Sequence, residues 1–277
     1  MNREHKSNLI FNIVLLCLSA IMVFPVVWWV FAAFKPLEEL SARTLLPHNI
    51  TFDNFIKGWN MLDSFTFATF FKNSLLIEVF IVTGAVLTSG FVAFGFARVK
   101  FKLRKFWFSI LMLTLMLPSQ VTVVSQFILF SKLGLVDSYV PLILPSFFGG
   151  GAFFIFLIIQ NIRGIPVDLD EAATIDGAGI FRIYWQIIFP LLKTPLITVG
   201  IFAFIWSWDD FYSQVLYISS VQKFTVGLAL IMFIDQFEVK WGQLLAMSLL
   251  SVVPAVILFF SAQKHFIAGI ATSGIKG

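Results

Sequence analysis

Six long apolar segments constrain the fold of this chain more than any other feature of its sequence. Each is long enough to cross the hydrocarbon core of a membrane as a helix, which needs about 20 predominantly apolar residues. None shows the short alternating pattern of membrane β-strands. The sequence therefore predicts an all-α polytopic membrane protein with six transmembrane helices, at about residues 8–34, 73–97, 106–131, 138–162, 194–218 and 241–263.

Composition agrees with a membrane protein and excludes some other classes. Of 277 residues, 59% are hydrophobic and only 12% are charged, whereas soluble domains carry about 25% charged residues. The single cysteine, Cys17, lies inside the first apolar segment, so no disulfide framework or cysteine-based metal site is expected. The three histidines are scattered without the spacing of metal ligands. We expect no metal site.

The basic residues indicate how the chain is oriented. Arg3 and Lys6 precede the first segment as in a signal peptide, but the uncharged run exceeds the about 7–15 residues of a signal-peptide core. No small-residue cleavage site follows it, so we expect a retained first span. Most of the 19 Lys and Arg residues, including the cluster Arg98–Lys105, fall on the side that carries both termini. Because cytoplasmic loops are enriched in Lys and Arg, both termini are expected to be cytoplasmic.

No internal repeat or linker divides the chain, so residues 1–277 are expected to form a single transmembrane domain. Two outer loops are expected at about residues 35–72 and 219–240. A cytoplasmic loop at about 164–190 joins the fourth and fifth spans.

The cytoplasmic loop contains signals for a short polar helix. Pro166 suits a first helical turn, and Gly177 can adopt the left-handed conformation that ends a helix. Carboxylates near the start interact favourably with the helix dipole; they are Asp168, Asp170 and Glu171. Small alanines would let such a helix enter a cleft on a partner protein. The alternative is a solvated connector that happens to be helical.

Several motifs together resemble one family. Glu171-Ala172-Ala173, followed by Asp176-Gly177-Ala178 and Pro190, resembles the EAA loop of binding-protein-dependent ABC importer permeases. The resemblance covers essentially the whole chain and is to the carbohydrate branch, similar to the smaller permease of maltose-type importers. The other matching segments are Asn73-Ser74, Phe96-Ala97-Arg98, Leu117-Pro118, Phe130–Leu135, Trp208-Asp209-Asp210-Phe211 and Gly274–Gly277. Position 209 is a departure, since the family usually has Asn there.

The resemblance implies a permease subunit of an ATP-driven carbohydrate importer, with an oligosaccharide as the expected substrate. Its implied location is the bacterial or archaeal cytoplasmic membrane. Its implied partners are a second homologous permease, two ATPase subunits, an extracytoplasmic solute-binding protein, membrane lipid and the sugar. The residues implied in coupling to the ATPase are Asp170, Glu171, Ala172, Ala173, Asp176, Gly177 and Ala178. The tail residues Gly274 and Lys276 are implied in ATPase contact, and residues 231–240 in contact with the binding protein.

Charges within the apolar segments mark candidate pathway residues. An Asp at a helix centre costs roughly 2.5–3.5 kcal/mol on insertion scales, so such residues usually face a bundle interior or a wet cavity. Aromatic rings beside polar groups suit sugars, which predicts a substrate passage lined by Trp208, Asp209, Asp210, Tyr212 and Gln214. The alternative is a polar break that bends the helix or contacts the partner permease.

Two further features of the spans allow more than one interpretation. Glu78 lies one turn inside the second span, where we expect it to be hydrated near the outer interface; facing the bundle is the alternative. Gly149-Gly150-Gly151 in the fourth span allows close helix approach or local unwinding, and we favour close packing.

The missing motifs also restrict the function. No glycine-rich phosphate loop is present, so ATP and Mg are expected on the partner subunits and no cofactor on this chain. No catalytic residues or nucleic-acid-binding surface are evident, and a non-enzymatic transport subunit is expected. A secondary transporter driven by an ion gradient is the main alternative, although paired inverted repeats are absent. A membrane enzyme or scaffold is a further alternative.

Overall fold

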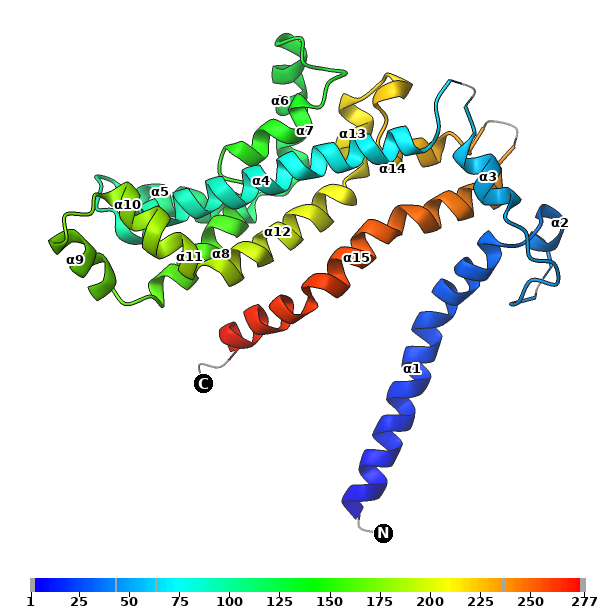
Figure 1. Cartoon of the computed structure of the whole chain (residues 1–277), viewed down its shortest axis with the longest axis horizontal. Coiled ribbons are helices and arrows are strands. Elements are labelled where there is room, and N and C mark those ends of the chain that lie inside the picture. Colours follow the sequence, from blue (N-terminus) through cyan, green and yellow to red (C-terminus); the bar gives the residue numbers. More distant parts are fainter. Residues whose placement is uncertain (1–2, 43, 63, 236–237, 275–277) are drawn as a thin grey trace. The chain divides into compact units, whose positions relative to one another are not determined.

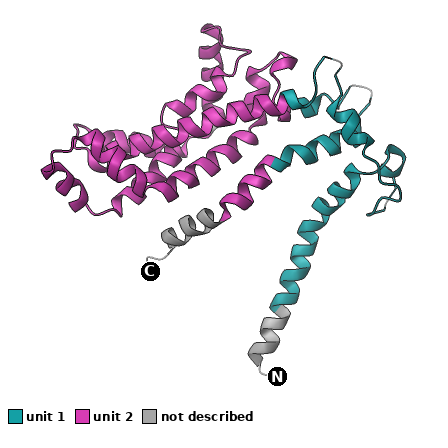
Figure 2. Ribbon diagram, viewed as in Figure 1, with its two compact units in different colours: residues 1–69, 229–253 teal, residues 70–228, 254–277 magenta. Residues whose placement is uncertain are grey.

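The computed structural model describes residues 3–42, 44–62, 64–235 and 238–274, and regular structure there is helical apart from one isolated β-bridge (Figure 1). It divides into two compact units, shown in Figure 2. Unit 1 comprises residues 1–69 and 229–253, and unit 2 comprises residues 70–228 and 254–277. The predicted all-α fold is confirmed.

Four helical stretches are long and apolar enough to cross a membrane: Phe11–Ala33, Ala68–Arg98, Val140–Arg163 and Trp241–Gln263. Two pairs of bent helices also qualify if each pair counts as one span, namely Arg104–Met116 with Gln120–Lys132 and Ile180–Leu191 with Lys193–Trp208. The described residues therefore contain four to six candidate spans. The six-span topology, its boundaries and the single-domain organisation stay predictions.

Unit 1 contains α1 (Arg3–Ala33), α2 (Leu37–Leu40) and α3 (Asp53–Trp59). It also contains the first two residues of α4 (Ala68–Arg98), the last three residues of α14 (Val226–Ile231) and the start of α15 (Trp241–Gly274). Its loops are ordered by buried polar side chains. The Asn54 side-chain amide donates to the carbonyls of Ala33 (3.0 Å) and Lys35 (2.8 Å). The buried Lys35 ammonium donates to both the carbonyl and the hydroxyl of Thr44. The Asn54 bonds attach α3 to the end of α1, and the Lys35 bonds attach Thr44 to the chain two residues after that end.

Unit 2 contains the remaining elements. They are α4 (Ala68–Arg98, from Phe70 on), α5 (Arg104–Met116), α6 (Ser119–Lys132), α7 (Val140–Ile143), η1 (Leu144–Phe147), α8 (Ala152–Arg163), α9 (Asp168–Ile175), α10 (Ile180–Ile183), η2 (Tyr184–Ile188), α11 (Phe189–Leu191), α12 (Lys193–Trp208), α13 (Phe211–Tyr217), η3 (Val221–Lys223) and α14 (Val226–Ile231, to Leu228).

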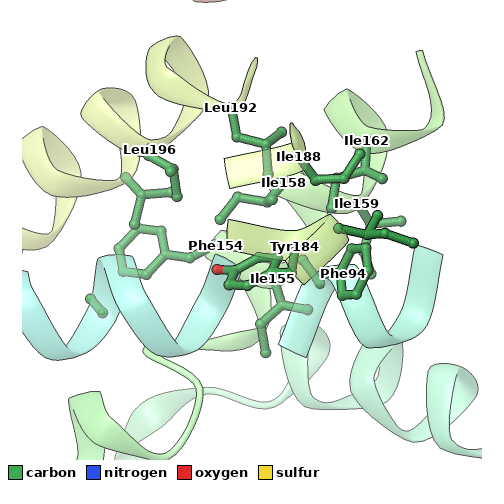
Figure 3. Close-up of a cluster of buried hydrophobic side chains, with 14 of the residues drawn as sticks. Phe94, Phe154, Ile155, Ile158, Ile159, Ile162, Tyr184, Ile188, Leu192 and Leu196 are labelled. Carbon is green, nitrogen blue, oxygen red and sulfur yellow. The ribbon is translucent and has the colours of Figure 1, made fainter. Parts of the chain in front are cut away.

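The apolar core of unit 2 joins α4, α8, α12 and the helical segment that follows α9. Figure 3 shows the side chains that gather around Tyr184. Ile158, Ile159, Ile162 and Ile188 are fully buried with it. Because lipid chains are as apolar as these side chains, close van der Waals packing stabilises this core. This core fixes the chain on both sides of the loop at about residues 164–190.

The glycine run in the fourth apolar segment both unwinds the helix and permits close packing. Gly149, Gly150 and Gly151 have φ values of +104°, +66° and +119°, and they separate η1 from α8. A Cβ on Gly150 would lie 2.7 Å from the Cα of Ala85 in α4. Both interpretations of this run are therefore correct, and the expected continuous helix over 138–162 is interrupted.

Gly150→Ala is expected to destabilise unit 2 by about 1–3 kcal/mol, because alanine at positive φ is strained and its Cβ would meet backbone atoms of α4. The measurement is thermal unfolding of the purified protein in detergent. Gly95→Ala is the matched control, since nothing lies within 4 Å of a Cβ there, and it should leave stability unchanged or slightly higher. An unchanged melting temperature in Gly150→Ala would contradict the close contact.

Candidate functional site

Helix α9 occupies the position of the polar helix expected from the sequence. It runs over Asp168–Ile175 and ends with Gly177 at a φ of +80°. The N–H of Gly177 donates to the carbonyl of Thr174 (3.0 Å), and that of Ala178 donates to the carbonyl of Ala173 (2.9 Å). This pair of bonds is a Schellman motif, in which glycine closes the helix end. The predicted glycine stop is confirmed.

One side of α9 packs on the core of unit 2, and the other side is exposed among the residues that the structure describes. Ala173 is buried in the core cluster. Of the residues predicted to couple to the ATPase, Glu171, Ala172, Asp176 and Gly177 are exposed, and Ala178 is half-buried. Ile175 is 86% exposed. It was not predicted as a functional residue, because a single Ile within an acidic helix is not a distinctive sequence pattern. The exposed residues of α9 and its C-terminal end therefore combine carboxylates, small residues and two large apolar side chains, Ile175 and Leu169.

Asp170 is turned inward rather than towards a partner. Its carboxylate pairs with the Arg98 guanidinium at the end of α4, with 2.8 Å between Asp170 Oδ2 and Arg98 Nε. Arg98 also donates through Nη2 to the carbonyl of Ile165 (2.6 Å). Burial raises the pKa of Asp170, and the neighbouring Arg98 charge opposes that rise without cancelling it. Arg98 thus holds both the start of the loop and α9 against α4.

A partly open cavity of about 290 Å³ lies in unit 2 beside the break between α12 and α13. Aromatic side chains contribute to its wall; they are Phe154, Trp206 and Tyr217. Polar side chains face the same space; they are Gln126, Ser146, Ser207, Asp210, Ser213 and Gln214. A largely apolar cavity with a few convergent polar groups is the usual form of a small-molecule site.

The candidate pathway residues lie at this break, but only some of them line the cavity. Asp210 and Gln214 do so. Asp210 also caps α13, since its Oδ1 accepts the N–H of Ser213 (3.1 Å). Trp208 lines a small neighbouring pocket and stacks on Phe204 at 5.3 Å between ring centres.

The other candidates lie on the surface around the break. Asp209 and Tyr212 are exposed and are not part of the cavity wall. The wall instead contains Trp206, which was not among the passage residues predicted from the sequence. Its position two residues before Trp208 places it on a different side of α12, where it packs on Phe153, Phe154 and Phe202.

Glu78 is buried, so the expected hydrated position was wrong. It is 4% exposed, and its Oε2 has no hydrogen-bond partner among the described residues. It faces the small pocket that also contains Trp208 and Gln214. The packing of α13 and α14 beside α4 buries this carboxyl, and no local pattern around position 78 encodes that packing.

Asp137 joins the α6–α7 connection to the segment after α13. Its carboxylate accepts the N–H groups of Ser219 (3.0 Å) and Ser220 (2.9 Å), the Ser220 hydroxyl and the Lys223 ammonium (3.0 Å). These bonds, led by those from Ser220, hold the pKa of Asp137 well below its usual range. Its own N–H donates to the carbonyl of Tyr217 (2.8 Å), a residue of the cavity wall.

The remaining candidates lie near the limits of the described residues. Gly274 is the last residue of α15, and Lys276 lies outside the described residues. In the loop 231–240, Ile234 and Val239 form an antiparallel bridge in unit 1, while residues 236–237 lie outside the described residues.

Comparison with known proteins identifies the family. The model of the family described as "binding-protein-dependent transport system inner membrane component" matches residues 85–272. The chain belongs to this family. It is therefore a multi-pass inner-membrane permease subunit and is not itself an ATPase, and the secondary-transporter alternative is wrong.

Named relatives extend the similarity over nearly the whole chain. The arabinooligosaccharides transport system permease protein AraQ of Halalkalibacterium halodurans is 34% identical over 94% of this chain and 93% of its own. The galactooligosaccharides transport system permease protein GanQ of Bacillus subtilis is 31% identical over 98% and 96%. A chain of a bacterial ABC transporter that imports the acidic polysaccharide alginate has the same fold, with a TM-score of 0.85, 21% identity and coverage of 96% and 99%.

Asp137→Asn is expected to lower the melting temperature at neutral pH. The Asn carbonyl oxygen can still accept the N–H groups of Ser219 and Ser220, but its NH2 group cannot accept from the Ser220 hydroxyl or the Lys223 ammonium, and the negative charge that attracts Lys223 is lost. The pKa of Asp137 is lower in the folded protein than in the unfolded chain. Its stabilisation is therefore complete above the unfolded value of about 3.9 and is lost as the pH falls through the folded pKa.

Melting temperatures measured from pH 7 downward check this expectation. The difference between wild type and Asp137→Asn should narrow below about pH 4. Asp53→Asn is the control, because its exposed pairing with Lys57 should contribute little at any pH. Equal melting temperatures for wild type and Asp137→Asn at pH 7 would show that the Asp137 bonds do not stabilise the contact between the α6–α7 connection and the segment after α13.

Proposed function

We propose that this chain forms half of the translocation pathway of an ATP-driven oligosaccharide importer. The observation that carries the substrate class is the cavity wall, where the rings of Phe154, Trp206 and Tyr217 lie beside Asp210 and serine and glutamine side chains. Rings cover the C–H faces of sugars, and the polar groups bind hydroxyls. The names of the relatives, which transport arabinooligosaccharides and galactooligosaccharides, support the same class.

The family depends on a binding protein, and the remaining assembly is part of the proposal. The chain pairs with a second homologous permease and two ATPase subunits, which hold ATP and Mg, and an extracytoplasmic solute-binding protein delivers the sugar. The membrane is the bacterial or archaeal cytoplasmic membrane, with both termini in the cytoplasm. Gly274 and Lys276 contact the ATPases, and residues 231–240 contact the binding protein.

In this proposal, α9 transmits movement of the ATPases to the spans. Its exposed side, with Glu171, Ala172 and Ile175, docks on the ATPase. Its attached side passes the force to the core through Ala173 and to α4 through the Asp170–Arg98 ion pair. Two packed arrangements of these helices then correspond to the inward-facing and outward-facing pathway, since packed interfaces switch between discrete states.

Trp206→Ala is expected to reduce uptake of a labelled oligosaccharide about three- to tenfold at limiting concentration, because a ring that covers a sugar face contributes about 0.5–1.5 kcal/mol. Uptake is measured in a deletion strain complemented with each variant, over a panel of labelled oligosaccharides. Tyr212→Ala is the matched control, since Tyr212 is also aromatic but is 61% exposed outside the cavity wall.

The control also separates two versions of the pathway. A loss with Trp206→Ala alone supports the cavity wall described above. An equal loss of uptake with Tyr212→Ala would instead show that the passage includes the exposed residues predicted from the sequence. Normal uptake with Trp206→Ala would contradict the proposal.

Ile175→Asp is expected to weaken retention of the ATPase subunits at least about fivefold, because truncating an apolar anchor buried at an interface costs more than about 1 kcal/mol. The measurement is co-purification of the ATPase with the tagged permease, together with uptake. Asp168→Asn lies on the same helix outside the EAA motif and should retain the ATPase. Uptake that persists without any ATPase but collapses with an uncoupler would overturn the proposed energy source.

A further inference from the structure

Three helix ends in unit 2 form a basic recess that plays no part in the proposed transport cycle. The recess has a volume of about 610 Å³. Its lining comes from the segment after α4, the first turns of α5 and the end of α8, and comprises Phe96, Lys100, Phe101, Leu103, Arg104, Lys105, Phe108 and Arg163. The positive-inside tendency assigns these helix ends to the cytoplasmic side.

Aromatic contacts shape the recess. Phe96 makes edge contacts with Phe101 (5.7 Å between ring centres) and Phe108 (6.1 Å). The Arg163 guanidinium lies 5.7 Å from the centre of the Phe108 ring, within the range of a cation–π interaction. Leu103, with a φ of +61°, turns the chain sharply into α5. The recess therefore has an apolar wall that carries cations from two separate segments.

The charges in the recess have one sign. Its lining has four cations and no carboxylate, and none of the four forms an ion pair within the described residues. Like charges in one hollow repel each other, so an anion bound there is favoured. Two of the cations are arginines, whose planar donors match phosphate oxygens in pairs.

Neighbouring side chains place the recess at the level of lipid headgroups. Phe106 and Trp107, in the first turn of α5, are 54% and 50% exposed, and aromatic side chains at the end of a span usually lie at the membrane interface. Leu103, on the rim, is 67% exposed. An anion that fits here carries apolar chains as well as a phosphate.

We propose that the basic recess binds the phosphate headgroup of an anionic phospholipid from the cytoplasmic leaflet. Lys100, Arg104, Lys105 and Arg163 pair with the phosphate, and the acyl chains lie over Leu103 and the exposed aromatic side chains. Basic pockets between the cytoplasmic ends of spans recognise such headgroups in general. Because α4 also ends at Arg98, which holds α9, the bound lipid stabilises the helix junction beside the coupling helix.

The test uses the assembled transporter purified in nanodiscs of phosphatidylcholine, with or without phosphatidylglycerol. Mass spectrometry after transfer to detergent counts the retained phosphatidylglycerol, and unfolding curves record the stabilisation by this lipid. The wild type should retain phosphatidylglycerol in preference to phosphatidylcholine. The triple variant Lys100→Gln/Arg104→Gln/Arg163→Gln should lose this preference, by about fivefold for each charge removed.

The matched control removes the same charge from the same side of the membrane. Lys102, Arg182 and Lys193 are exposed and lie outside the recess, so Lys102→Gln/Arg182→Gln/Lys193→Gln should keep the lipid preference. The single variant Lys100→Gln, at an exposed position, gives a smaller loss and guards against misfolding of the triple variant.

Three results would overturn the proposal. An equal loss in the control would show diffuse attraction to an anionic membrane instead of a site. Displacement of the lipid by inorganic phosphate would assign the recess to a free anion. Cross-links from Lys100 to the ATPase, with no lipid retained, would assign it to a protein interface. None of these results affects the proposed oligosaccharide transport, which the uptake assays test separately.

Discussion

Close packing along the helix α4 is the constraint on which the rest of unit 2 depends. Gly150 approaches α4 at Ala85, Ser146 and Phe147 of η1 approach it at Gly84, and Tyr184 meets it at Gly90. At such sites an added methyl group would meet neighbouring atoms, and protein interiors leave little space for it. Neighbouring segments can therefore pack closely against α4 only where small residues or unusual backbone angles leave space for them. The positions of these residues determine where the other segments of unit 2 contact α4.

The same helix collects the polar connections of the unit. Near its start, the Asn73 amide donates to the carbonyls of Gln222 (2.8 Å) and Phe224 (2.9 Å), and the Ser74 hydroxyl accepts the N–H of Val226 (2.9 Å). At its end, Arg98 holds Asp170 and Ile165. One 31-residue helix thus links the segment after α13 to α9. Movement at α9 therefore has a direct mechanical route to the region of the cavity.

Local features were predictable wherever a short run of residues carries its own physical reason. The start and end of α9 follow from its acidic first turn and from Gly177, and both are present in the structure. The break at Asp209-Asp210 follows from the cost of charge within an apolar helix. The cavity wall was harder to predict, because Trp206 and Trp208 are equally aromatic and only the rotation of α12 against α8 decides which one lines the cavity.

The sequence by itself determined the all-α membrane fold, the family and the position of the polar helix α9, because apolar length, helix caps and a dense motif are encoded within contiguous residues. The tertiary structure alone decided that Glu78 is buried, that Asp170 turns inward to Arg98, and that basic residues from separate segments form one recess. These features depend on side chains far apart in the chain that meet only when helices pack, and no periodicity or spacing within a single segment specifies such a meeting.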